Sequence, residues 1–158
     1  MPLRCKRPPG IEALERYKDV QLIDPAYVAG EEHLNSAITQ AEKAFLRKEN
    51  ISANPLIEVL VRASLTGQIK NAFETLGLRG SNEVIAISEE YPKGLIEEYG
   101  CVEDRSILDI DEKKYEEIKE VFGIGEREIM AVSGPGFVDR VRTLQRVITE
   151  RIALINKI

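Results

Sequence analysis

Histidine and cysteine are scarce in this chain: His33 is the only histidine, and Cys5 and Cys101 are the only cysteines. A structural zinc site takes about four nitrogen or sulfur ligands, often from closely spaced cysteine pairs. The two cysteines lie far apart in the sequence, so we expect neither zinc nor any other metal. We expect both cysteines to be free thiols, as in a reducing compartment. A disulfide between them is possible, but their spacing does not support one.

The motifs of nucleotide-dependent and nucleophilic enzymes are also missing. The chain has no G-x-x-x-x-G-K-[ST] loop, and no G-x-G-x-x-G run follows an expected strand. Gly134-Pro135-Gly136 precedes an expected helix, but its proline lacks a backbone donor that a phosphate cradle needs. A catalytic triad would have to use His33, and a lone histidine near the start of a helix is more often structural or exposed. We therefore expect neither catalysis nor a cofactor, with an enzyme using His33 as the less favoured alternative.

Long apolar runs are absent as well. None approaches the ~20 residues of a membrane span. The first ten residues are basic and proline-rich, without the apolar segment of a signal peptide. The net charge of −5 argues against a protein that coats nucleic acid through bulk positive charge, although a local basic patch is compatible with it. We expect a cytoplasmic protein without a membrane partner.

What the chain does contain fits one globular domain. Its 158 residues are 43% hydrophobic and 31% charged, enough to bury a core without metals or disulfides. We expect a mixed α/β (α+β) fold, with residues 17–158 as a single domain after an N-terminal arm (1–16) whose order stays open. A small mixed β-sheet would be flanked by helices, the last of them long. Apolar patterns predict strands at residues 17–24, 56–64, 82–88 and 107–110, and helices at 31–48, 67–76, 93–99, 111–122, 126–132 and 137–156.

The helix expected at residues 31–48 separates apolar from basic side chains. Its apolar stripe consists of Leu34, Ile38, Ala41 and Phe45. At about 100° per residue, one flank of the stripe carries positive, polar and small side chains. These are His33, Ser36, Ala37, Gln40, Lys43, Ala44 and Arg47. Small residues between cations would let a phosphodiester backbone approach closely. Two interpretations stay open, an RNA-binding flank and an ordinary solvated one.

The C-terminal helix carries two apolar stripes. The main stripe, expected to face the core, consists of Phe137, Val141, Leu144, Ile148, Ile152 and Ile155. A second stripe, roughly 100° round the helix, consists of Val147, Leu154 and Ile158. A surface helix needs only one apolar face. The second stripe is therefore either covered by this domain or exposed for a partner helix.

Three segments in this order resemble a known family. They are LIDP with VAGEEHL (residues 22–34), IEVLVRAS followed by Gln68-Ile69 (residues 57–69), and VITERIALI (residues 147–155), which is similar to a closing helix of the form ERxALL. Over almost its whole length the chain resembles the small accessory subunit of the KEOPS complex, the PRPK-binding protein (TPRKB) family. One departure is that the family often has Ser-Gly where this chain has Ser64-Leu65.

The resemblance implies a protein without chemistry of its own. KEOPS makes the threonylcarbamoyl modification of the adenosine beside the anticodon in certain tRNAs, and another subunit performs the transfer. This family binds the small atypical kinase/ATPase subunit and helps recruit tRNA through its single-stranded 3′ CCA end. By this resemblance we expect tRNA contacts from His33, Gln40, Lys43, Arg47, Arg62 and Lys70, and kinase-subunit contacts from Val147, Ile148, Arg151, Ile152, Leu154 and Ile155. The alternative is a protein-only regulator of the kinase-like subunit that never touches RNA.

Overall fold

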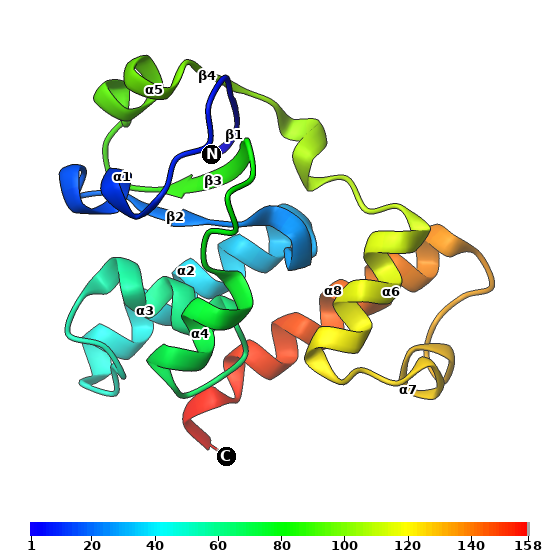
Figure 1. The fold of residues 1–158 in the computed structure, drawn as a ribbon. Coiled ribbons are helices and arrows are strands. Elements are labelled where there is room, and N and C mark those ends of the chain that lie inside the picture. The colour runs from blue at the N-terminus through cyan, green and yellow to red at the C-terminus, as the bar shows by residue number, and fades with distance from the viewer. Residues whose placement is uncertain (158) are drawn as a thin grey trace.

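A four-stranded sheet organises the computed structural model, which describes residues 1–157 (Figure 1). Its strands are β1 (Pro2–Cys5), β2 (Gln21–Ile23), β3 (Glu83–Ile87) and β4 (Cys101–Glu103), in the order β2-β3-β1-β4. Leu3 of β1 pairs with Val84 of β3 on one side and with Glu103 of β4 on the other, while Ile23 of β2 pairs with Ile85 of β3. All of these pairings are antiparallel.

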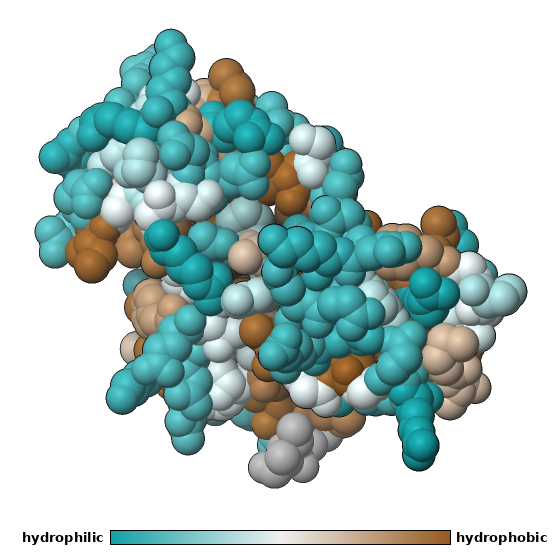
Figure 2. Space-filling view, turned by 45° about the vertical axis from the view of Figure 1, so that its right-hand side comes forward, coloured by the Kyte–Doolittle hydropathy of each residue, from teal (hydrophilic) through white to brown (hydrophobic). Residues whose placement is uncertain are grey.

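Helices cover both faces of this sheet. They are α1 (Ile11–Arg16), α2 (Gly30–Arg47), α3 (Pro55–Ala63), α4 (Ile69–Leu76), α5 (Lys93–Tyr99), α6 (Glu112–Phe122), α7 (Glu126–Met130) and α8 (Phe137–Ala153). Short 3-10 turns lie at Pro25–Tyr27, Arg105–Leu108 and Ile155–Lys157. On the face shown in Figure 2, hydrophilic side chains predominate and apolar ones gather in small patches. Within residues 1–157, no helix is both long enough and apolar enough to cross a membrane.

The sheet separates two hydrophobic cores. Ile23, Ile85 and Ile87 contribute to the larger core, which α2, α3, α4, α6 and α8 complete. The neighbouring strand residues Leu22 and Val84 belong instead to the smaller core, with side chains from α1 and α5. In Figure 1, α5 lies on the side of the sheet away from α2 and α3. This division follows from the alternation of side chains along a strand, and it buries β3 on both faces, as its unbroken apolar run predicted.

The predicted fold class is confirmed, because one small domain combines a sheet with flanking helices and ends in the long helix α8. The sheet is antiparallel rather than mixed, however. The predicted β-α-β order included a strand at residues 56–64, and that segment is helical. Residues 1–16, expected as an arm, supply α1 and the inner strand β1.

Residues 56–63 belong to helix α3 instead of the predicted strand, and Ser64 is the C-cap of this helix. Asn54 caps this helix, because its Oδ1 accepts hydrogen bonds from the backbone N–H groups of Leu56 and Ile57, and Pro55 occupies the first turn. The helix packs against α2, α4 and β2, and residues 58–63 are all buried. A short apolar segment that is buried on most sides cannot be told from a strand by its periodicity. That ambiguity explains the wrong prediction.

Residues 107–110 were predicted as a strand but do not form one. The last strand of the structure in chain order is β4, a few residues earlier. The residues before and within this segment form a 3-10 turn, Arg105–Leu108, whose start is capped by the Asp104 carboxylate accepting from the Ser106 N–H at 3.0 Å. Four residues are too few for periodicity to separate a turn from a strand. The predicted helices correspond to α2 and to α4–α8 within a few residues at each end.

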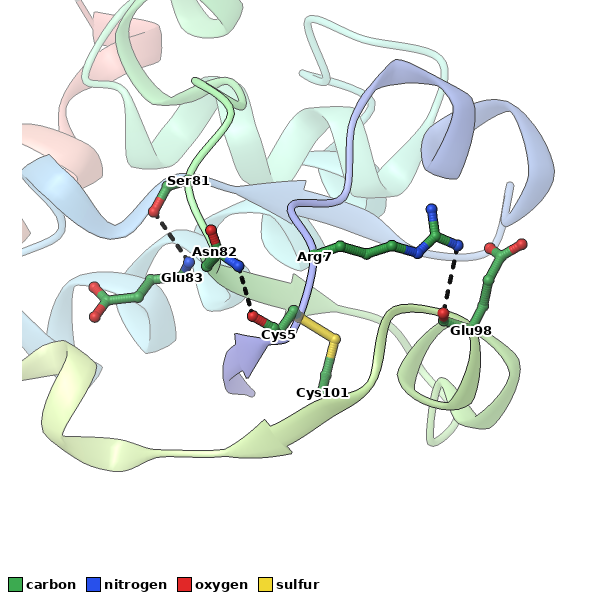
Figure 3. Close-up of a disulfide and its surroundings, with 7 residues drawn as sticks. All are labelled: Cys5, Arg7, Ser81, Asn82, Glu83, Glu98 and Cys101. Atoms are coloured by element: carbon green, nitrogen blue, oxygen red, sulfur yellow. Dashed lines mark hydrogen bonds between the residues drawn. A yellow bond between two sulfur atoms is a disulfide. The ribbon is translucent and has the colours of Figure 1, made fainter.

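Cys5 and Cys101 form a disulfide, so the prediction of free thiols was wrong. The two cysteines are direct partners across β1 and β4, with their Cα atoms 3.9 Å apart, although 96 positions separate them in the sequence. Beside this bond the Asn82 side-chain amide donates to the Cys5 carbonyl, and the Arg7 guanidinium donates to the Glu98 carbonyl (Figure 3). The cross-link therefore fastens the N-terminal strand to the segment that leaves α5.

Candidate partner-binding and RNA-binding surfaces

Helix α8 sends most of its apolar side chains into the core. The buried ones come from both predicted stripes and are Leu144, Val147, Ile148 and Ile152. Because α2, α6 and α7 pack against α8, Val147, Ile148 and Ile152 are core residues rather than the partner contacts that were predicted. Where the helix ends, Leu154 is 48% exposed and Ile155 is half-buried. Ile158 of the second stripe lies outside the described residues.

Arg151, another predicted partner contact, is held by the domain itself. One of its guanidinium nitrogens donates to the Phe122 carbonyl at the end of α6, at 2.7 Å. Another donates to the Glu128 carboxylate of α7, at 3.2 Å. These bonds tie α8 to α6 and α7 just before the exposed Leu154. The side chain remains partly exposed, so its outer edge still borders the surface at the end of α8.

Arg62 belongs to a buried network, and the prediction that it contacts tRNA is therefore wrong. Its Nε donates at 3.1 Å to the fully buried Glu58 carboxylate. That carboxylate also accepts hydrogen bonds of 2.6 and 2.7 Å from two backbone N–H groups of the α2–α3 loop. The other guanidinium nitrogens of Arg62 donate to the Asn156 side chain and to the Glu49 carbonyl. Arg62 thus joins α3 to the segments that follow α2 and α8.

His33 is fully buried, so it is neither an RNA contact nor a base facing a cleft. Its Nδ1 accepts from the Ala29 N–H at 2.9 Å, which places the proton of the neutral ring on Nε2, and Nε2 donates to the Ala63 carbonyl at 2.6 Å. The ring meets that of Phe122 edge-on, with ring centres 5.9 Å apart. Burial lowers the pKa of His33 to about 4, because the charged ring would lose its hydration. His33 is a neutral structural residue that joins the start of α2 to the end of α3.

The other predicted RNA contacts lie on two helices. On α2, Gln40 is half-buried, while Lys43 and Arg47 are exposed. Steps of three and four residues place these three side chains on one side of the helix. Lys70 is also exposed, but it belongs to the first turn of α4. The structure therefore places Gln40, Lys43 and Arg47 on one side of α2 and Lys70 on a different helix.

Two arginines that the sequence analysis did not single out border this basic flank. Arg142 and Arg146 are exposed one turn apart on α8 and line a shallow pocket with Glu32 of α2. By helix geometry Glu32 and Lys43 lie only about 20° apart around α2. The arginines of α8 therefore lie beside the first turn of α2, on the side of the helix that carries Lys43 about three turns further on. Their spacing of four residues on an amphipathic helix was the available signal.

Comparison with known proteins identifies the family of this chain. The family model described as Kinase binding protein CGI-121 matches residues 11–156, which include every helix from α1 to α8. The chain belongs to the CGI-121 family. One CGI-121 relative is the Regulatory protein Cgi121 of Methanocaldococcus jannaschii, which is 34% identical over 105 residues, covering 66% of this chain and 70% of that protein.

Membership of the CGI-121 family confirms the resemblance that the sequence segments indicated. The CGI-121 match runs through α8 to residue 156 and thus includes the accessible Leu154 and Ile155. It also includes the basic flank of α2. The family description names a kinase as what CGI-121 binds.

Proposed function

We propose that this protein is a non-catalytic subunit of the KEOPS complex that binds the small kinase-like ATPase subunit and recruits tRNA through its 3′ CCA end. One observation carries the first part. The apolar side chains of Leu154 and Ile155 are accessible at the end of α8, in a chain of the kinase-binding CGI-121 family. Isolated apolar side chains are ordinary at a protein surface, so the support comes from two adjacent ones at a helix end in a chain of a kinase-binding family.

The end of α8 suits docking because the fold holds it from two sides. Arg151 is bonded to the Phe122 carbonyl of α6, and the Asn156 side-chain amide donates to the Glu49 carbonyl at 3.1 Å. A docking residue on a backbone that is already fixed loses little conformational entropy on binding. In this proposal Leu154 enters an apolar pocket of the kinase-like subunit, and the partly exposed Arg151 lies at the rim of the contact.

Replacing Leu154 with glutamate tests the docking site. We expect Leu154→Glu to abolish co-purification with the kinase-like subunit without lowering the melting temperature of the isolated protein, because the side chain is already half exposed. Val138→Glu is the matched control, since Val138 is 63% exposed in the first turn of the same helix. If Leu154→Glu binds the subunit like wild type, or if both changes weaken binding equally, the docking site lies elsewhere.

The tRNA part of the proposal is supported by the exposed cations of α2, Lys43 and Arg47. A single strand exposes base edges and π-faces, so a protein can hold it with few charges. That is compatible with a net charge of −5. Because few phosphates would be neutralised, affinity for isolated tRNA should be modest and salt-dependent. Two phosphate contacts to a single strand predict a fall of roughly sevenfold in affinity between about 50 and 200 mM salt.

Charge reversal on α2 tests this assignment. We expect Lys43→Glu with Arg47→Glu to weaken tRNA binding by about tenfold at low salt and to flatten its salt dependence. Binding to the kinase-like subunit should be unchanged. The matched control is Lys18→Glu with Arg127→Glu, which reverses two exposed cations on other parts of the surface. If the two double variants bind tRNA equally in a filter-binding titration, then α2 is not the tRNA-binding surface.

The rival proposal, a protein-only regulator of the kinase-like subunit, is favoured by one observation. His33 and Arg62 are buried, which removes two of the predicted RNA contacts. A pull-down with intact tRNA and with tRNA that lacks its 3′ CCA separates the proposals. We expect recovery of the intact tRNA only. No recovery of either tRNA would favour the protein-only regulator, and equal recovery of both would show that the CCA end is not what is recognised.

A further inference from the structure

An apolar groove on the other flank of α2 has no role in either proposed surface. It has a volume of about 670 Å³ and lies between α2, the first half of α3 and the end of β3. Its large apolar lining residues are Ile38, Phe45, Leu46, Leu56, Val59 and Ile87. Concave, mainly apolar sites of this size are the usual form of binding pockets in proteins.

Leu46 shows that packing within the domain does not account for this apolar surface. Its side chain is 85% exposed, although it borders the groove. Its neighbour Phe45 and the lining residues Ile38 and Leu56 are only half-buried. A single exposed leucine is ordinary on a protein surface, but an exposed one beside a concave apolar lining indicates an interaction site.

The charges of the groove indicate what it can bind. Its charged lining residues are Glu42 and Glu89, both exposed, and within residues 1–157 no lysine or arginine lines it. These carboxylates would repel the phosphates of RNA and attract the cations of a protein segment. Glu42 and Leu46 lie one turn apart on α2, and Lys43 and Arg47 lie about 100° further round the helix. The helix thus presents an acidic, apolar flank and a basic flank side by side.

We propose that this groove binds a peptide segment of a partner protein in which two large apolar residues are flanked by lysine or arginine. The apolar side chains would fill the space between α2 and α3. The flanking cations would pair with Glu42 and Glu89 at the rim. Amphipathic segments of this kind dock into apolar grooves through a few anchoring side chains. The site uses α2, α3 and β3, so it does not depend on docking at the end of α8.

Three fluorescein-labelled peptides with the same leucine and phenylalanine anchors, flanked by Lys/Arg, by Ser or by Glu, test the proposal against the full chain. By fluorescence anisotropy we expect the Lys/Arg peptide to bind about tenfold more tightly than the Ser peptide, and the Glu peptide to bind weakest. Chemical-shift changes in the ¹⁵N-labelled protein should centre on Ile38, Phe45, Leu46 and Leu56. Binding should be the same in Leu154→Glu, which separates this site from the proposed kinase-docking site.

Two sets of variants complete the test. Leu46→Lys should weaken the Lys/Arg peptide about tenfold or more, whereas the control Ile11→Lys should not, since Ile11 is 72% exposed on α1 and outside the groove. Glu42→Lys with Glu89→Lys should reverse the preference for Lys/Arg flanks. Failure of every peptide to bind, equal affinity for all flanks or unchanged binding by Leu46→Lys would overturn the proposal. So would tighter binding of a single-stranded RNA oligonucleotide to the same groove.

Discussion

Lowering the pH from 7 to 4.5 should destabilise this fold through one side chain, His33. In the folded protein the ring is buried and neutral, with Nδ1 accepting from the Ala29 N–H and Nε2 donating to the Ala63 carbonyl. Burial lowers the pKa of His33 from 6.5 to about 4, whereas in the unfolded chain the pKa stays near its ordinary value. Between these two values the unfolded state binds more protons than the folded state, so acid favours unfolding.

The magnitude follows from the two pKa values. The stabilising contribution is complete above pH 6.5 and is lost as the pH falls toward 4. At about 1.36 kcal/mol for each pKa unit, the whole shift corresponds to about 3 kcal/mol. Between pH 7 and 4.5 the linkage relation gives a loss of about 2 kcal/mol from this histidine alone. That is a substantial share of the free energy of unfolding of a typical domain, which is about 10 kcal/mol.

The variant His33→Gln isolates this contribution, because glutamine keeps an N–H donor for the Ala63 carbonyl and does not titrate. At pH 7 it should be less stable than wild type by about 1–3 kcal/mol, since the buried Ala29 N–H loses its acceptor. In urea titrations followed by circular dichroism, this difference should shrink by about 2 kcal/mol at pH 4.5, because carboxylate titration affects both proteins alike. A difference that stays constant over this range would mean that the ring is not buried and neutral, and would make His33 a candidate RNA contact again.

Three other changes probe how the fold is held together. Reducing the Cys5–Cys101 disulfide, which spans 96 positions, should lower the free energy of unfolding by about 2–5 kcal/mol, because it frees a long loop of the unfolded chain. Thermal melts with and without reductant measure this, and equal melting temperatures would contradict it. Arg62→Met should destabilise the protein by about 3–5 kcal/mol, because the Glu58 carboxylate would stay buried without its cation. Adding Glu58→Gln should recover part of the loss in urea titrations, and a single variant as stable as wild type would refute the buried pair. Ile152→Glu should prevent folding, since this side chain of α8 is fully buried, so a well-folded circular dichroism spectrum would contradict the packing of α8.

Local sequence signals predicted the helices that have a clear hydrophobic periodicity or a recognisable capping residue. The helix predicted at residues 111–122 begins where its first residue can cap it: the Asp111 carboxylate accepts from the Lys114 N–H at 2.8 Å at the start of α6. The helix predicted at residues 67–76 ends at the predicted residue, and Gly77 is the C-cap of α4. Helix α3 had an equally local signal in Asn54-Pro55, a cap followed by a first-turn proline. Its apolar, β-branched composition outweighed that signal, which is why a strand was predicted.

Strand β1 and the disulfide could not be predicted in the same way, because both depend on segments that are distant in the sequence. Leu3 pairs with Val84 and with Glu103, and Cys5 pairs with Cys101. Strand preference depends on packing against neighbouring strands more than on the backbone of the strand itself. A four-residue strand in a basic, proline-rich stretch therefore shows no signal until its neighbours are known.

The burial of His33 was missed because a helical wheel orders residues around one helix without showing how many sides of it are covered. On α2, His33 lies beside the apolar stripe, and the Ala63 carbonyl of α3 and the Phe122 ring of α6 both meet it. Lys43 and Arg47, further round the same flank, remain exposed. The helical wheel therefore predicted exposed side chains correctly for Lys43 and Arg47, toward the end of α2, and wrongly for His33, at its start.

Helix α2 is the element that all three proposed surfaces share or touch. At its start, the Gln145 side-chain amide of α8 donates to the Ala29 carbonyl at 3.2 Å, and beyond its end Asn156 donates to the Glu49 carbonyl at 3.1 Å. Both ends of α2 are thus tied, to the middle of α8 and to the 3-10 turn that follows it, so the basic flank of α2 and the exposed end of α8 keep a fixed relative position. Substitutions at the exposed Lys43 and Arg47 leave both ties in place. A change in tRNA affinity in these variants can therefore be attributed to the charges themselves, and kinase-subunit binding measured on the same proteins is an independent test of the docking end.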